Sequence, residues 1–139
     1  MYSIKLIPKE HIKVVLPLLK ELNPKITLVI LEKRLTEMIL SGYECIGVYR
    51  KSKLIGVSGI WFLTKLYVGK HIEPDNVYIL PEYQGKGIGN LLMNWIFEYA
   101  KSKNCIASEL NCYTGNEEGQ KFWEKQGYDL IAYHYQKKL

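Results

Sequence analysis

The sequence predicts an α/β or α+β domain in which helices pack against a central sheet. Segments of strand period and of helical period follow the order strand, two helices, three strands, helix, strand, helix and strand. The 139 residues contain no linker, repeat or low-complexity segment, so residues 1–139 are expected to form a single domain. With 47% apolar and 24% charged residues, a chain of this length can bury a core without disulfides or metal ions.

The first third of the chain predicts one strand and two helices. Residues 2–7 alternate between apolar and polar side chains, and Pro8 ends them. Residues 9–22 follow a helical pattern, in which Pro17 predicts a kink or a late helix start. The apolar face of this helix carries Ile12, Val15, Leu16 and Leu19. A second helix is predicted over residues 27–40. Its inward residues are Leu31, Leu35, Met38 and Ile39.

Three strands are predicted in the middle of the chain. Residues 43–50 and 53–63 have strand patterns, and a short polar turn at residues 51–52 joins them. Residues 71–80 predict the third of these strands. Within it, Pro74 indicates a sheet edge or a bulge, because proline cannot donate to the ladder.

The C-terminal part predicts two helices and two strands. The strongest helical pattern follows residue 87. Its core-facing stripe consists of Ile88, Leu91, Leu92, Trp95, Ile96 and Tyr99. Residues 105–112 predict a strand, residues 116–126 a short helix that Gly127 ends, and residues 128–137 a last strand.

Charge and cysteine usage restrict the partners and the compartment. The net charge of +5 favours anionic partners, but the lysines are scattered and no groove-reading motif accompanies them, so nucleic-acid binding is not expected. The N-terminus lacks a signal-peptide core, and no run approaches the roughly 20 apolar residues of a membrane span. Cys45, Cys105 and Cys112 form no CxxC pair, which favours a reducing compartment and packing roles. A cytoplasmic protein without a membrane partner is therefore expected.

No metal site is predicted from the histidines. His11, His71 and His134 show no metal-ligand spacing, and none is placed by sequence to activate a cysteine.

The most informative segment is the glycine-rich stretch 84–89, which joins a predicted strand to the strongest helix. A helix N-terminus has unpaired N–H groups and a partial positive charge. Glycines before it let successive N–H groups point into one concave nest that can bind a diphosphate. Gly87 and Gly89 lack Cβ atoms that would block close approach, and Gln84 can donate a side-chain N–H to the same oxygens.

Glycines at a strand-to-helix junction also occur in simpler turns and in different nucleotide loops. The three glycines could also serve a tight turn and bind nothing. A Rossmann loop requires G-x-G-x-x-G and a Walker loop requires G-x-x-x-x-G-K-[ST], and neither string is present.

Two stretches resemble one known family. Residues 78–89, YILPEYQGKGIG, resemble motif A of the GNAT superfamily of N-acetyltransferases, which carries [Q/R]-x-x-G-x-[G/A]. Residues 116–128, NEEGQKFWEKQGY, resemble its motif B, N-x-x-A-x-x-F-Y-x-x-x-G-F. The order of elements extends the resemblance to nearly the whole chain, although specific motifs occur only between residues 78 and 128. The resemblance implies a mixed, mostly antiparallel central sheet flanked by helices.

The same resemblance implies acetyl-CoA as the cosubstrate. Its pyrophosphate would bind the N–H groups of Gln84, Gly85, Lys86, Gly87, Ile88 and Gly89. The main chain of Ile79 and Leu80 would pair with the pantetheine arm like an added strand, and an N–H near Ile79 would stabilise the oxyanion. Asn116 would contact the arm, and Phe122 and Trp123 would lie near it.

The chain departs from motif B at two positions. Gly119 replaces the usual alanine, which should weaken that helix by up to about 1 kcal/mol. Trp123 stands where the family often has the tyrosine that protonates the leaving thiolate, and an indole N–H cannot supply a proton near neutral pH. Tyr113 and Tyr128 are candidate acids by sequence position, and otherwise the thiolate leaves unassisted.

Two carboxylates are candidates for the base that takes the amine proton. Asp75 is the first choice, because it shares strand parity with Ile79 and would face the same side as the reacting carbonyl. Glu73, with the same parity, is the second choice. A bulge at Pro74 would change that count, and both carboxylates also fit the role of solvated edge residues.

The sequence thus predicts an N-acetyltransferase that moves an acetyl group directly to a primary amine of a small molecule or peptide. A non-catalytic acyl-CoA-binding sensor or regulatory domain is the alternative that Trp123 keeps open, and a nucleic-acid-binding protein is indicated by net charge alone. Nothing selects the acceptor, since acceptor loops vary within one fold. His134 is a further candidate for the acceptor side, because the last strand often borders that pocket in the GNAT superfamily. A homodimer also remains open.

Overall fold

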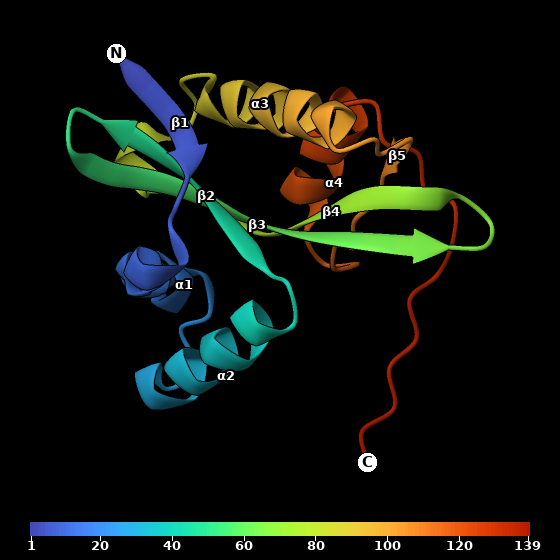
Figure 1. The fold of residues 1–139 in the computed structure, drawn as a ribbon, viewed down its shortest axis with the longest axis horizontal. Helices are drawn as coiled ribbons and strands as arrows, with labels where there is room; N and C mark the ends of the chain where they lie inside the picture. The colour runs from blue at the N-terminus through green and yellow to red at the C-terminus, as the bar shows by residue number, and fades with distance from the viewer.

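The computed structural model describes residues 1–139 and contains one five-stranded sheet with helices on both faces (Figure 1). The strands are β1 (Tyr2–Leu6), β2 (Glu44–Arg50), β3 (Lys53–Lys65), β4 (Gly69–Ile79) and β5 (Ala107–Ser108). The helices are η1 (Lys9–Val15), α1 (Leu16–Leu22), α2 (Leu28–Leu40), η2 (Pro81–Tyr83), α3 (Ile88–Ser102) and α4 (Glu117–Lys125), of which η1 and η2 are 3-10 helices. This order matches the predicted one up to α4.

The strands lie side by side in the order in which they occur in the chain. β1 to β4 are antiparallel neighbours, whereas β5 runs parallel to β4. The predicted mixed, mostly antiparallel sheet is therefore confirmed. The parallel ladder joins only His71 and Ile72 to β5, so the remainder of β4 has no strand along that edge.

The sheet separates α3 on one face from α1 and α2 on the other (Figure 1). Tyr99 of α3 donates its hydroxyl to the Glu44 carboxylate of β2 at 3.0 Å. On the opposite face, Tyr78 of β4 donates its hydroxyl to the Glu21 carboxylate of α1 at 3.1 Å. The two sides of β4 therefore face different helices, and the direction of each side chain on this strand decides which layer it joins.

The buried stripe of α3 shares Ile88, Leu92 and Ile96 with the predicted one, whereas Trp95 and Tyr99 are only half-buried. It consists of Ile88, Leu92, Met93, Ile96 and Ala100. Leu91 was expected to face the core but is 47% exposed, because the stripe is centred on Leu92 and Ile96 and Leu91 points away from it. None of the helices combines the length and the apolar character that a membrane-spanning helix needs.

The first helical pattern starts late, as Pro17 predicted. Residues 9–15 form η1, and α1 begins at Leu16 with Pro17 in its first turn, where a missing N–H costs no hydrogen bond. The four residues predicted to face inward are all buried.

β4 contains a bulge two residues beyond Pro74. Asn76 and Val77 together oppose the single residue Ser58 of β3. The flanking pairs are Asp75 with Gly59 and Tyr78 with Val57. Asn76 adopts a positive φ of 56°, a conformation that asparagine tolerates better than most residues. The Asn76 amide also donates to the Tyr43 hydroxyl at 3.0 Å, which holds the bulge against the sheet.

Two predicted strands near the C-terminus are wrong in extent. The strand predicted over 105–112 is reduced to Ala107–Ser108, because the chain diverges from β4 beyond that point. The strand predicted over 128–137 does not form, since residues 129–139 are extended but make no hydrogen bond within the chain. Strand pairing requires a neighbouring strand, and none lies beside this segment.

Candidate functional site

The glycine-rich loop forms a tight turn between η2 and α3. Gly85 and Gly87 have φ values of 73° and 79°, in the left-handed region that glycine adopts without strain. A Cβ added at either position would meet no atom within 4 Å, so these glycines face open space. Gly87 caps the N-terminus of α3 without any side-chain hydrogen bond.

Six consecutive backbone N–H groups at this turn have no partner in the protein. They belong to Gly85, Lys86, Gly87, Ile88, Gly89 and Asn90. The first N–H of this region that is bonded is that of Leu91, which donates to the Gly87 carbonyl at 3.3 Å. The turn is not plugged by a side chain, and its N–H groups lie at the positive end of the α3 dipole. This arrangement can accept an anion with several oxygens, such as a diphosphate.

Gly89 has a second reason to be a glycine, which the sequence pattern did not indicate. A Cβ at this position would lie 3.0 Å from Cε1 and 3.1 Å from Cζ of Phe122 on α4. The ring of Phe122 therefore rests on the first turn of α3, and Phe122 stacks edge-to-face on Trp123 at 4.8 Å between ring centroids. Gly89 thus allows α4 to approach the loop closely.

At the end of β4, Ile79 directs its main-chain N–H and carbonyl toward the edge that β5 leaves unpaired. The Leu80 N–H donates to the Ile55 carbonyl of β3 at 2.9 Å, and the Leu80 carbonyl accepts from Tyr83 at 2.9 Å. Leu80 therefore has no main-chain group left for an added strand, contrary to the expectation. By strand alternation, the N–H and carbonyl of Ile79 point away from β3. The side-chain amide of Gln84 donates to the Ile79 carbonyl at 2.8 Å.

The bulge places Asp75 and Ile79 on opposite faces of β4, so the expected shared parity is wrong. Asp75 is paired with Gly59, whereas Ile79 is paired with Gly56, and those two β3 residues point to opposite sides. The additional residue in β4 reverses the alternation after Asp75. Asp75 belongs to the face covered by α1 and α2, where the indole N–H of Trp61 donates to its carboxylate at 3.0 Å.

Tyr43 is the buried member of a cluster of polar side chains that it forms with Trp61 and Asp75. Its ring lies 4.9 Å from the Trp61 ring and occupies the space above Gly59, where an added Cβ would overlap the Tyr43 hydroxyl. Burial raises the pKa of Tyr43 far above its ordinary value, so the phenol stays protonated. Trp61 and Asp75 are half-buried and Tyr43 is buried, which makes this a fixed polar cluster rather than a solvated edge.

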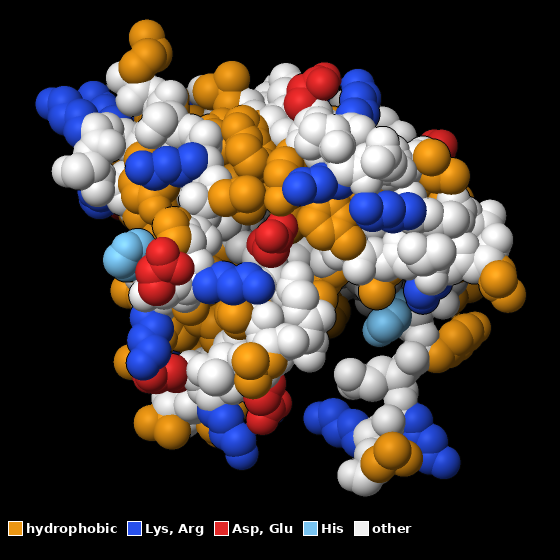
Figure 2. Space-filling view, in the orientation of Figure 1, with side chains coloured by type: hydrophobic (Ala, Val, Ile, Leu, Met, Phe, Trp, Pro, Cys, Tyr) orange, Lys and Arg blue, Asp and Glu red, His pale blue; other side chains and the backbone are white.

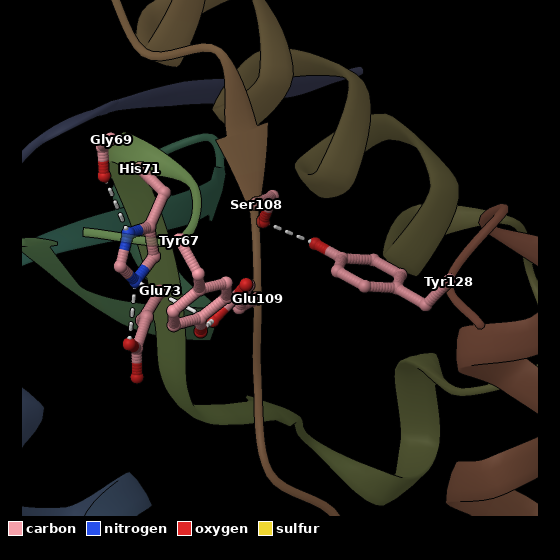
Figure 3. A network of polar contacts seen from close by, with 7 residues as sticks. All are labelled: Tyr67, Gly69, His71, Glu73, Ser108, Glu109 and Tyr128. Atoms are coloured by element: carbon pink, nitrogen blue, oxygen red, sulfur yellow. Dashed lines mark hydrogen bonds and ion pairs between the residues drawn. The ribbon is translucent and has the colours of Figure 1, made fainter. Parts of the chain in front are cut away.

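A second polar cluster surrounds Glu73, and the histidine spacing gave no indication of it (Figure 3). The buried His71 places Nε2 at 2.8 Å from Glu73 Oε2 and at 3.8 Å from Glu109 Oε1. The other ring nitrogen of His71 lies 3.3 Å from the carbonyl of Gly69. Tyr67 donates its hydroxyl to Glu109. The parallel pairing of β4 with β5 brings these residues together, and sequence separation concealed that proximity.

The donor atoms of His71, Glu73 and Glu109 all lie within 4.8 Å of one another, a separation at which a metal ion could be bound. No buried side-chain atom here lacks a hydrogen-bond partner, however, because the protein itself satisfies the imidazole. The cluster therefore explains how Glu73 is held, and it needs no ion to do so.

The two candidate acids lie in different environments. The Tyr128 hydroxyl is 2.6 Å from Ser108 Oγ (Figure 3). The Tyr128 ring packs against Phe97 and Trp123. Burial raises the pKa of Tyr128 to about 12. Tyr113, in contrast, is 89% exposed. Of the two, Tyr128 is the one that the structure fixes in place.

Asn116 is already used as a helix cap. Its side-chain oxygen accepts from the Gly119 N–H at 2.9 Å at the start of α4. A Cβ at residue 119 would lie 2.4 Å from the Asn116 amide nitrogen, which gives a structural reason for glycine at this departure from motif B.

The three cysteines are free thiols with raised pKa values. Burial raises the pKa of Cys45 to about 12, and burial also raises the pKa of Cys105 and of Cys112. The thiolate form is therefore disfavoured at each of the three cysteines, which fits a packing role better than a nucleophilic one. On the face shown in Figure 2, lysine and arginine side chains are dispersed among acidic and apolar ones.

A comparison with protein-family models decides the family. The model for the acetyltransferase (GNAT) family matches residues 18–128, which include the free N–H groups of the loop, β4 and α4. The chain belongs to the GNAT family of acetyltransferases. Residues 129–139 of this GNAT chain lie beyond the matched region.

Individual relatives of this GNAT domain are distant. A thialysine N-epsilon-acetyltransferase of Sus scrofa is 27% identical over 84 residues, which are 60% of this chain and 45% of the relative. The one from Mus musculus is 24% identical over 81 residues, 58% of this chain and 48% of the relative. The chain thus spans about half the length of the curated relatives that it matches.

Solved structures agree in fold over the whole GNAT chain. A ribosomal-protein-alanine N-acetyltransferase from Brucella melitensis biovar Abortus 2308 superposes with a TM-score of 0.84 at 20% identity, covering 100% of this chain and 99% of that one. AAC(6')-Iy, solved in complex with the bisubstrate analogue CoA-S-monomethyl-acetylneamine, has a TM-score of 0.83 at 15% identity, with 100% and 99% coverage. At these identities the likeness establishes the fold alone.

Proposed function

We propose that the chain is an acetyl-CoA-dependent N-acetyltransferase that transfers the acetyl group directly to a primary amine of a small molecule or peptide. The observation that carries the proposal is the run of six unpartnered N–H groups at the positive end of α3. Backbone donors in this number are costly to leave unpaired unless water or a ligand satisfies them, and a diphosphate matches their charge and spacing.

The main chain of Ile79 extends the proposed binding site along β4. Its carbonyl is held by the Gln84 side chain, an exposed group that can rotate away when an amide of the pantetheine arm takes its place. The Ile79 N–H on the same edge is placed to donate to the thioester oxygen, on which negative charge develops during attack. Both contacts lie on the part of β4 that β5 leaves unpaired.

In the proposed reaction, the amine nitrogen bonds to the thioester carbon, the carbon–sulfur bond breaks and coenzyme A leaves as a thiolate. The proton of the amine passes to a carboxylate, directly or through a water molecule. Asp75 remains our first choice for its orientation alone, because Trp61 fixes one carboxylate oxygen and leaves the other free to accept. Since Asp75 and the Ile79 side chain lie on opposite faces of β4, the transfer from the amine to Asp75 would pass through a water molecule. Glu73 is the second choice, since His71 orients it in a similar manner.

The leaving thiolate requires little help. A coenzyme thiol has an ordinary thiol pKa of about 8.5, so the thiolate is a moderate base near neutral pH. Tyr128 has a pKa of about 12, raised by burial, and is therefore a hydrogen-bond donor in this scheme rather than a strong acid. Trp123 packs between Phe122 and Tyr128 and supplies no proton.

Two measurements test the proposal. Acetyl-CoA should raise the melting temperature of the chain, because a ligand of the folded state stabilises it. An amine panel that includes thialysine, an aminoglycoside and a peptide with N-terminal alanine should then release free thiol with at least one member. A melting temperature unchanged at millimolar acetyl-CoA would contradict the assignment. Binding without release from any amine would favour the sensor alternative.

A matched pair of variants separates the two candidate bases. Asp75→Asn and Glu73→Gln each remove one negative charge and keep the shape of the side chain. If Asp75 is the base, Asp75→Asn lowers kcat by about 100-fold or more, whereas Glu73→Gln changes it much less. The reverse result would assign the role to Glu73, and equal small effects would mean that the amine binds already deprotonated.

A further inference from the structure

The turn between β3 and β4 has an unusual composition. Its two central residues are Leu66 and Tyr67, and the Val68 N–H donates across the turn to the Lys65 carbonyl at 3.4 Å. Leu66 is 109% exposed and Tyr67 is 66% exposed. Hairpin turns favour glycine, asparagine and aspartate, and the turn between β2 and β3 also has polar residues, a lysine and a serine at residues 51–52. Large apolar side chains at the β3–β4 turn are therefore not explained by the turn itself.

Ile106 extends the apolar surface of this turn. Its N–H donates to the Lys70 carbonyl at 2.9 Å, and its Cδ1 would lie 3.3 Å from a Cβ added at Gly69. The Ile106 side chain thus lies beside the first residues of β4, and it is 76% exposed. Tyr67 turns its hydroxyl back toward Glu109 (Figure 3). Neighbouring apolar side chains that folding leaves in water indicate an interaction surface.

Three lysines surround these apolar residues. Lys65 directly precedes the turn. The Lys70 Nζ lies 5.6 Å from the centroid of the Phe62 ring, and the Lys103 Nζ lies 5.6 Å from that of the Tyr99 ring. The two ring centroids are 5.8 Å apart, so Lys70 and Lys103 rest on neighbouring aromatic side chains. None of the three lysines forms an ion pair with a carboxylate.

Acidic residues are scarce at this end of the sheet. The stretches 62–72 and 99–108 contain four lysines and no aspartate or glutamate. Glu109, which follows directly, accepts a hydrogen bond from Tyr67 and lies 3.8 Å from His71 Nε2. The exposed surface at this end, which we call the hairpin tip, is therefore both apolar and positively charged. It consists of Lys65, Leu66, Tyr67, Lys70, Lys103 and Ile106.

The hairpin tip projects from the body of the molecule. In Figure 1 the turn between β3 and β4 extends beyond α3, α4 and β5. A convex surface of this kind does not enclose a small ligand, but it can enter a soft, flat surface. The glycine-rich loop lies at the opposite end of β4, so a contact at the hairpin tip leaves the proposed cofactor site open.

We propose that the hairpin tip binds an anionic lipid surface. Leu66 and Ile106 enter the headgroup region, and Lys65, Lys70 and Lys103 contact the phosphate and carboxylate groups of the lipids. The tyrosine of the tip suits this interface, because its ring is apolar and its hydroxyl is polar. With two apolar side chains and three cations, the attachment is weak and reversible. Such a contact requires no spanning segment, which is the only kind of membrane contact that a long apolar run would indicate.

The first test measures the binding of the full chain to vesicles by sedimentation. Phosphatidylcholine vesicles that contain about 30% phosphatidylserine should bind the chain at least about tenfold more strongly than vesicles of phosphatidylcholine alone. Raising the ionic strength from about 0.1 M to about 1 M should remove most of this difference, because the Debye length falls from about 10 Å to about 3 Å. Equal binding to both kinds of vesicle, or no binding to either at millimolar lipid, would overturn the proposal.

Matched variants test whether the contact lies at the hairpin tip. Leu66→Ser should weaken binding to the anionic vesicles by about tenfold, because it removes the most exposed apolar side chain of the tip. Lys70→Gln should weaken this binding by about fivefold. Two controls make the same exchanges elsewhere, Leu40→Ser at the end of α2, where the leucine is 85% exposed, and Lys51→Gln in the turn between β2 and β3. The controls should change binding by less than about twofold. Equal losses in tip and control variants would overturn the proposal, because net charge alone would then attract the chain, and melting curves check that all four variants fold.

A last measurement distinguishes a lipid surface from an acidic protein as the partner. Leu66→Trp keeps a large apolar side chain at the tip, and lipids brominated on their acyl chains should quench the added tryptophan emission when the vesicles bind. The same lipids should quench the emission of the unaltered chain much less. An acidic protein partner would instead give binding to immobilised poly-L-glutamate that Leu66→Ser weakens, without additional quenching in Leu66→Trp. That result would overturn the assignment to a lipid surface.

Discussion

Gly87 offers the sharpest test of the anion-binding loop. The residue caps α3 in a left-handed conformation with φ 79°, and a side chain there would enter open space. Gly87→Asn and Gly87→Asp introduce side chains of the same shape, and both residue types visit this conformation more readily than others. Each should destabilise the fold by about 1 kcal/mol, and the two variants differ only in charge.

The charge difference should act in opposite directions on folding and on binding. Without ligand, the aspartate lies at the positive end of α3 and should make that variant more stable than the asparagine variant by about 0.3–1 kcal/mol. With coenzyme A, one carboxylate at about 4 Å from each of two phosphates costs about 1 kcal/mol per pair at the dielectric constant of water. The sum of about 2 kcal/mol corresponds to roughly 30-fold weaker binding of coenzyme A by Gly87→Asp than by Gly87→Asn.

Two assays measure these opposite effects. Isothermal titration with coenzyme A gives the two dissociation constants, and chemical denaturation without ligand gives the two stabilities. Repeating the titrations at about 1 M salt should reduce the difference in affinity, because the Debye length falls to about 3 Å. Equal affinities of the two variants at low salt would refute the placement of the phosphates at this turn.

Three further predictions concern packing and hydrogen bonds. Gly89→Val should destabilise the fold by about 1–3 kcal/mol in denaturant unfolding, because its side chain meets the Phe122 ring, and a Phe122→Leu background should remove much of that loss. Trp61→Phe should cost about 1 kcal/mol by removing the donor to Asp75, and an unchanged stability would mean that this hydrogen bond does not form in solution. For Tyr128, burial raises the pKa to about 12, so its contribution to stability is complete below the unfolded pKa of about 10 and is lost as pH rises through 12. Tyr128→Phe should therefore show a shallower loss of stability between pH 10 and 12 than the unaltered chain, and equally steep curves would contradict a buried phenol.

Much of the fold could be predicted from sequence, because in the N-terminal helices and in the turn before α3 the residue pattern and the contacts within a few residues indicate the same structure. The glycines before α3 occur where left-handed conformations are required, and the apolar stripes of the N-terminal helices face the core as their periodicity indicates. Pro17 lies in the first turn of α1, the position that proline chemistry allows. The loop and its free N–H groups were likewise accessible from sequence, because they depend on backbone geometry within six residues.

The parts that could not be predicted depend on contacts between distant segments. The bulge in β4 is visible only in the register against β3, so counting by twos from Asp75 to Ile79 gave the wrong face. The grouping of His71 with Glu109 follows from a parallel pairing of two residues in each strand. The pattern over 128–137 does describe a strand-forming sequence, but a sequence pattern cannot reveal whether a neighbouring strand exists within the chain.

The bulge near the end of β4 limits how regular this sheet can become. An extra residue bends its strand and increases the local twist, and here the bend at residues 76–77 lies between Ile72, the last residue paired with β5, and the end of β4. Deleting Asn76 would let Val77 face Ser58 and would leave the later pairs unchanged. A straightened β4 would give a different direction to the edge from which the Ile79 main chain points outward. The bulge therefore shapes the edge along which the proposed coenzyme arm would lie.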